Sequence, residues 1–101
     1  MKTKEIKLVE LPKTLKIHSQ DKQMTWHEAM DYAASIGMRL PTKFELQVIV
    51  ESTDEFNDLG WTWSSSTNSN FTTNAWNVYL NNGNTTDGNK TNTSSVLCVK
   101  D

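Results

Sequence analysis

Apolar residues recur at helical spacing in the first half of the chain and alternate in the second half. The helical spacing predicts two helices there. Each opens on a Thr-x-x-Glu capping box, Thr25 with Glu28 and Thr42 with Glu45, in which two side chains satisfy free backbone N–H groups. Gly37 stands where a left-handed residue ends the first helix. The second helix should end about ten residues after its cap.

The second half predicts short strands joined by long polar loops. Alternation marks strands at 61–65, 75–80 and 95–100, and Val96 and Cys98 of the last one face away from their neighbours. The connecting stretches 66–74 and 84–94 are rich in Asn and Thr, which predicts loops, and Asn82-Gly83 is a tight-turn signal. Trp61, Trp63 and Trp76 should lie in the core, because indole rings are costly to leave in water.

Two further strands are predicted before the helices. The first covers 6–11 and is ended by Pro12, and the second covers 15–17 and is followed by a polar turn at 20–23. The six lysines of residues 1–22 are expected to keep an edge strand from unwanted pairing. The element order and the length of 101 residues predict one α+β domain, residues 1–101.

Charge and composition narrow the classes of function. The net charge is −2 and no basic stripe is present, so direct binding of nucleic acid is not expected. No apolar run approaches the roughly 20 residues that span a bilayer, so no membrane segment is expected. Cys98 is the single cysteine, which favours a reducing, cytoplasmic location, or secretion if a leader peptide has been removed. Asn-x-Ser/Thr triplets begin at Asn70, Asn84, Asn89 and Asn92, and a cytoplasmic location would leave them unmodified.

The chain offers little for catalysis or for metal binding. Cys98 lies in an apolar strand pattern, where a buried and inert thiol is expected. His18 and His27 are not at metal-ligand spacing, and no Cys/His/acid cluster supports them. We therefore expect no enzymatic activity, no cofactor and no metal.

Several short motifs follow one another in a fixed order along the chain. The motifs are Arg39-Leu40-Pro41-Thr42, Glu45-Leu46, Trp63-Ser64-Ser65-Ser66, Ala75-Trp76-Asn77-Val78, Asn82-Gly83 and Val96-Leu97-Cys98-Val99-Lys100. In this order and spacing they resemble a bacterial domain family found at the C-terminus of collagen-like adhesins, over about residues 25–100. Leu97 departs from the family pattern, which has a basic residue there, whereas Lys100 matches it.

The resemblance implies two helices packed on a small, twisted, mostly antiparallel sheet with long polar loops, related to the formylglycine-generating-enzyme and C-type-lectin-like fold. Such folds host sugar binding, protein binding and cysteine oxidation, so the fold alone does not choose among them. The oxidases of this group need a cysteine pair, which is absent. A lectin-type calcium site is not expected, because Val78 replaces the acid after Trp76-Asn77 and Asp87 is the single acid between Gly60 and Val99.

These observations predict a non-catalytic module that recognises a protein partner through its polar loops. Two alternatives remain: a phage-encoded intracellular inhibitor of a host defence complex, similar in role to anti-CRISPR proteins, and a metal-independent glycan-binding module. An acidic cluster around the exit of the second helix is a second candidate surface. Its alternatives are a solvated acidic loop, a docking surface for a basic partner and a weak cation site. The predicted loop contacts are Asn68, Asn70, Phe71, Asn77, Tyr79, Asn81 and Asn84, and the acidic cluster is Glu51, Asp54, Glu55 and Asp58.

Overall fold

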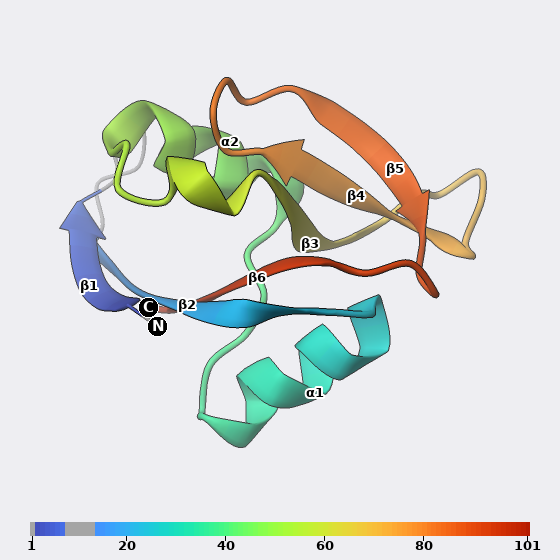
Figure 1. Ribbon diagram of the computed structural model, residues 1–101, viewed down its shortest axis with the longest axis horizontal. Helices are drawn as coiled ribbons and strands as arrows, with labels where there is room; N and C mark the ends of the chain where they lie inside the picture. Colours follow the sequence, from blue (N-terminus) through green and yellow to red (C-terminus); the bar gives the residue numbers. More distant parts are fainter. Residues whose placement is uncertain (1, 8–13) are drawn as a thin grey trace.

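The computed structural model describes residues 2–7 and 14–101, and these form a six-stranded sheet with one α-helix on each face (Figure 1). The elements in chain order are β1 (Lys2–Lys7), β2 (Thr14–Met24), α1 (Trp26–Ser35), α2 (Lys43–Ser52), the 3-10 helix η1 (Asn57–Leu59), β3 (Trp61–Thr67), β4 (Asn74–Tyr79), β5 (Thr85–Asn89) and β6 (Ser94–Lys100).

The strands lie in the order β1-β2-β6-β3-β4-β5. Neighbouring strands are antiparallel except β3 and β6, which run parallel where Thr62 meets Ser95. The predicted α+β class, with two helices on a small, mostly antiparallel sheet, is confirmed. The lysine-bearing β1 forms one edge of the sheet, as expected for a strand that must not pair further.

Both helices begin at the predicted capping boxes. Thr25 accepts a hydrogen bond from the Glu28 N–H and Thr42 accepts one from the Glu45 N–H, while each glutamate side chain accepts from the backbone of its threonine. Gly37 follows the end of α1 with φ +73°, a conformation that disfavours side chains with a Cβ. The second helix ends at Ser52, as its pattern predicts.

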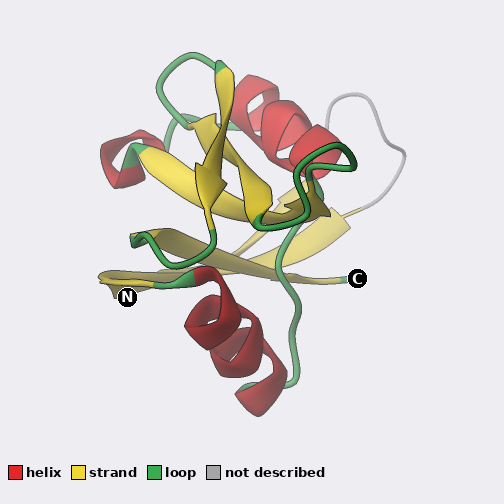
Figure 2. Ribbon diagram, turned by 90° about the vertical axis from the view of Figure 1, so that its right-hand side faces the viewer, coloured by secondary structure: helices red, strands yellow, loops and turns green. Residues whose placement is uncertain are grey.

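The central strand β6 is buried on both faces, which explains its nearly continuous apolar sequence. Leu97 and Val99 face α2 and meet a cluster built from β2, α2 and β4, whereas Val96 and Cys98 face α1. Figure 2 shows α1 and α2 on opposite sides of the sheet. The predicted division of β6 between two faces is therefore confirmed.

Two polar stretches predicted to be turns or loops are strands instead. The predicted turn at 20–23 continues β2 to Met24, through an irregularity between Gln20 and Met24, and pairs with β6. The predicted loop at 84–94 contains β5, which pairs with β4 along its whole length. Both predictions were wrong because backbone pairing with a neighbouring strand is enough to hold a strand that has an exposed face. Such a strand does not have to contain apolar residues. Of the predicted first strand, residues 8–11 lie outside the described part of the chain.

The three tryptophans predicted to form the core have three different environments. Trp63 is fully buried, and its indole N–H donates to the Met24 carbonyl at 2.9 Å. Trp76 is half-buried beneath Lys43, and Trp61 is 40% exposed. Burial of Trp61 was predicted wrongly, because the helix that covers Trp63 does not extend over it.

Candidate functional site

The two turns that hold most of the predicted loop contacts lie at opposite ends of β4 (Figure 1). The turn 68–73, hereafter the Phe71 turn, precedes β4 and lies beside the connection between β5 and β6. The turn 81–84 follows β4 and lies near the end of α2. The polar loops therefore form two separate surfaces.

A carboxylate holds the Phe71 turn in place. Asp87 of β5 accepts hydrogen bonds on Oδ2 from the side-chain amides of Asn68 at 3.0 Å and Asn74 at 2.9 Å. Asn68 Oδ1 in turn accepts the Asn70 backbone N–H at 2.9 Å. Hydrogen bonds from Asn74 and Asn68 lower the pKa of the Asp87 carboxyl, so the acceptor stays ionised in neutral solution.

Phe71 is the most exposed large apolar side chain of the described residues, with 64% of its surface accessible. Its backbone is fixed on both sides, since its N–H donates to the Asn68 carbonyl and its carbonyl accepts the Asn74 N–H at 2.8 Å. Asn70 is exposed beside it. Asn68 is buried and positions the turn, so its prediction as a surface contact was wrong. A polar stretch of sequence does not predict which of its asparagines will be buried.

A hollow opens beside the Phe71 turn and the start of α1. The backbone closes its base, where the Lys90 N–H donates to the Thr73 carbonyl and the Trp26 N–H donates to the Lys90 carbonyl. Lys90 Nζ lies 4.1 Å from the Trp26 ring centroid. Sequence reasoning missed this hollow, because its residues are far apart in the chain and match no motif. About 430 Å³ in volume, it is lined by His27, Thr72, Thr73, Asn89, Lys90 and Thr91.

The opposite end of β4 brings the other predicted contacts together. We call the surface formed by residues 51–61, Tyr79 and residues 81–84 the Trp61 end. Gly60, at φ +67°, turns the chain from η1 into β3, and its carbonyl accepts the Leu80 N–H at 3.0 Å. The Trp61 and Tyr79 rings lie 5.0 Å apart between centroids, and Asn81 and Asn84 are exposed nearby in the turn.

The acidic cluster lies at this same end. Glu51, Asp54 and Asp58 are exposed and Glu55 is half-buried. From residue 44 to residue 89 the chain contains no Lys, Arg or His. The two sets predicted separately, the acidic cluster and the second group of loop contacts, thus lie at one end of β4.

Asn77 was predicted to be an exposed contact, and this was wrong. It pairs in register with Trp63 and is only 5% exposed. Gly88 of the neighbouring strand provides space for it, since a Cβ at Gly88 would lie 3.1 Å from Asn77 Nδ2. Its Oδ1 is buried and accepts no hydrogen bond within the described part of the chain. Replacing Asn77 would therefore perturb the sheet as well as any partner contact.

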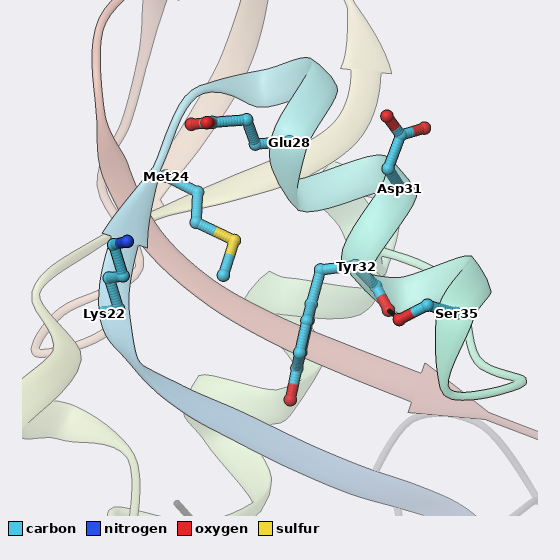
Figure 3. Close-up of a pocket in the computed structure, with 6 residues that line it drawn as sticks. All are labelled: Lys22, Met24, Glu28, Asp31, Tyr32 and Ser35. Atoms are coloured by element: carbon cyan, nitrogen blue, oxygen red, sulfur yellow. Dashed lines mark hydrogen bonds between the residues drawn. The ribbon is translucent and has the colours of Figure 1, made fainter.

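A second hollow of about 410 Å³ lies between the end of β2 and α1 (Figure 3). The Met24 and Tyr32 side chains both extend into the space between β2 and α1, and the Tyr32 hydroxyl lies 2.8 Å from His18 Nε2. Lys22, Glu28 and Asp31 give its rim charges of both signs. None of the predicted contacts lines this hollow, and its mixed charge does not define one ligand.

The Arg39-Leu40-Pro41-Thr42 motif has a structural role. Arg39 forms two hydrogen bonds to the buried Glu45 carboxylate, at 2.7 and 2.9 Å, and another to Asp101 at 2.9 Å. Glu45 Oε1 also accepts the Thr42 N–H at 2.8 Å. These bonds to Glu45 and Asp101 raise the pKa of the Arg39 guanidinium, so the charge persists. The cluster ties the start of α2 to the end of the chain.

The groups capable of covalent or metal chemistry are few. Cys98 is fully buried, and burial raises the pKa of its thiol to about 12, which makes it a poor nucleophile. Within residues 2–7 and 14–101, no three His, Cys, Asp or Glu side chains are placed to hold a metal ion together. The helices described there, α1 and α2, have ten residues each, too few to cross a bilayer.

Two comparisons with known proteins gave different results. A search of curated proteins finds no match. The family model of the Lcl C-terminal domain matches residues 3–100, nearly the entire chain. The capping box at Thr42, the Arg39–Glu45 pair and the buried β6 are the structural forms of the motifs that indicated this relationship. The chain belongs to the Lcl C-terminal domain family.

Proposed function

We propose that this domain is a non-catalytic module that binds a protein partner through the Phe71 turn. The observation that carries the proposal is Phe71, exposed over 64% of its surface on a turn that Asp87 holds in one conformation. Aromatic side chains commonly supply most of the binding energy in protein interfaces. A preformed turn also loses less conformational entropy on binding than a mobile loop does.

The proposed contact surface consists of Phe71 with the exposed Asn70 and Thr72, while Asn68 and Asp87 keep the turn in shape. A stable complex would cover about 800 Å² of this domain, an area that extends well beyond the turn. The proposal includes a small inhibitor that covers a host complex as well as a recognition domain of a larger protein. The single cysteine favours a reducing compartment, and therefore a partner protein in the cytoplasm.

The test is partner capture from the native host with matched phenylalanine variants. Phe71→Ser removes the proposed contact, and Phe44→Ser removes an apolar side chain that is 52% exposed in the first turn of α2. A protein retained by the wild type and by F44S, but lost with F71S at unchanged melting temperature, supports the proposal. Retention by F71S, or equal loss with both variants, contradicts it.

A metal-independent glycan site is a second candidate, favoured by the hollow beside the turn. Thr72, Thr73, Asn89 and Thr91 line it with hydroxyl and amide groups that match sugar hydroxyls. Glycan binding that persists in EDTA and is lost with Thr73→Val would support this function. The same oligosaccharides bound equally by T73V would contradict it.

A further inference from the structure

Three of the four tryptophans are covered within the molecule, and Trp61 is not. Trp63 is buried, while Lys90 lies over Trp26 and Lys43 lies over Trp76, each with Nζ 4.1 Å from the ring centroid. Trp61 is 40% exposed. No cation lies over its ring, and its indole N–H donates no hydrogen bond within residues 2–7 and 14–101.

The chain around Trp61 carries carboxylates and no basic residue. Residues 44–89 contain no Lys, Arg or His. Asp58 is exposed three positions before Trp61, and Asp54 is exposed at the same end. The region around an open aromatic ring is therefore negatively charged.

The indole is also held ready for a ligand. Its centroid lies 5.0 Å from that of Tyr79, with the rings inclined by 42°. The backbone on either side is fixed, because Trp61 pairs with Tyr79 in the sheet and Gly60 accepts the Leu80 N–H. A ring already positioned in this way loses little freedom when something stacks on it.

We infer that the Trp61 end binds a basic segment of a partner protein, with an arginine stacked on Trp61 and paired with Asp58. A guanidinium is planar, stacks on aromatic faces and forms two parallel hydrogen bonds to a carboxylate, so it suits this surface better than an ammonium. Asp54 would receive a second basic residue of the same segment. This inference does not rest on the proposed function, because Phe71 lies at the other end of β4.

The direct test follows the indole N–H signals of the intact, ¹⁵N-labelled protein by NMR. Four variants, each with one Trp→Phe substitution, assign the four signals, because each variant lacks the signal of the replaced tryptophan. The probes are three blocked peptides that differ at two positions, which hold arginine, lysine or citrulline, the uncharged analogue of arginine. We expect the arginine peptide to move the Trp61 signal most and the lysine peptide less. The citrulline peptide should leave it unchanged, and added salt should weaken the effect of the charged peptides.

Variants separate a local site from general charge attraction. Trp61→Leu keeps an apolar side chain without the aromatic face, and should weaken arginine-peptide binding about two- to fivefold. Asp58→Asn should weaken it and reduce its dependence on salt. Asp31→Asn, at an exposed acid on α1, changes the net charge equally and should leave binding unchanged.

Several results would overturn the inference. They are equal binding of the arginine and citrulline peptides, movement of other indole signals with Trp61 unmoved, and equal effects of D58N and D31N. A Trp61 signal that shifts with protein concentration alone would show that a second copy of the chain occupies the surface instead. These measurements use the wild-type fold or variants checked by their spectra, and F71S should leave them unchanged.

Discussion

Trp61 and Trp63 lie two residues apart on one strand and face the same side of the sheet, yet one is 40% exposed and the other fully buried. Trp63 belongs to the cluster formed with Ala29 and Ala33 of α1. Trp61 lies outside that cluster, and its ring is tilted against that of Tyr79. Alternation along a strand therefore decides which face a side chain shares, and the neighbouring helix decides whether that part of the face is covered.

The covered and uncovered parts of this face also differ in chemistry. The covered part is apolar and holds the buried thiol of Cys98. The uncovered part has an exposed indole beside carboxylates and no cation from the local chain. We expect changes in the covered part to affect stability and changes in the uncovered part to affect recognition.

The largest effect should come from replacing Trp63 by alanine, and the same change at Trp61 is its comparison. Trp63→Ala removes a fully buried ring and the hydrogen bond to Met24, and should lower the free energy of unfolding by about 3–5 kcal/mol. Trp61→Ala should lower it by about 1–2 kcal/mol, because much of that ring is already in water. Urea denaturation measures both. Equal losses would show that α1 does not distinguish the two positions.

The reactivity of the Cys98 thiol tests whether α1 keeps reagents away from the covered part of the sheet. With the pKa of Cys98 raised to about 12 from 9.0, the folded protein at pH 8 should hold on the order of a thousandfold less thiolate than an ordinary cysteine. Labelling by a thiol reagent should therefore be very slow and should accelerate in urea along with unfolding. Rapid labelling of the native protein would mean that the face opens locally.

Acid should loosen the Phe71 turn, because an ionised carboxylate holds it in place. The pKa of Asp87 is lowered in the folded protein by Asn74 and Asn68, so its contribution to stability is present above the unfolded-state pKa of about 4. That contribution disappears as the pH falls through the folded pKa. Urea midpoints measured between pH 7 and pH 3 should decline at the acid end. Asp87→Asn should flatten part of this decline, and an unchanged profile would contradict it.

The smallest effects should come from removing the cations that cover the other indoles. Lys90→Met and Lys43→Met keep the apolar stem and remove the charge above Trp26 and Trp76, so each should cost about 0.5–1 kcal/mol. Differential scanning calorimetry at low and high salt measures these costs. If neither variant loses stability, the cations do not stabilise the rings that they cover, and these rings do not differ from Trp61 in this respect.

Local signals predicted much of the fold. The two capping boxes, Gly37 and the alternating residues of β6 acted through contacts within a few positions of the chain. They gave the helix starts and the division of the last strand between two faces. Local signals failed for β5 and for the end of β2, where pairing with a distant strand outweighs polar composition.

The candidate sites were less predictable than the fold. Asn68 and Asn70 lie in the same polar stretch, but Asn68 holds the turn and Asn70 is exposed, while Asn77 in the alternating pattern of β4 is buried. The partners that make the difference, Asp87 and Gly88, come from β5, which the sequence did not predict as a strand. The separation of the loops into two surfaces follows from the same strand pairing.

The sequence by itself determined the helix starts, the two faces of β6, the family and the concentration of negative charge after α2, because these depend on residue type and short spacing. Only the tertiary structure decided that Trp61 is exposed while Trp63 is buried, and that Trp61 and Tyr79 form an aromatic pair. Exposure is a property of what packs above a residue, and here that is a helix more than twenty-five positions away in the chain.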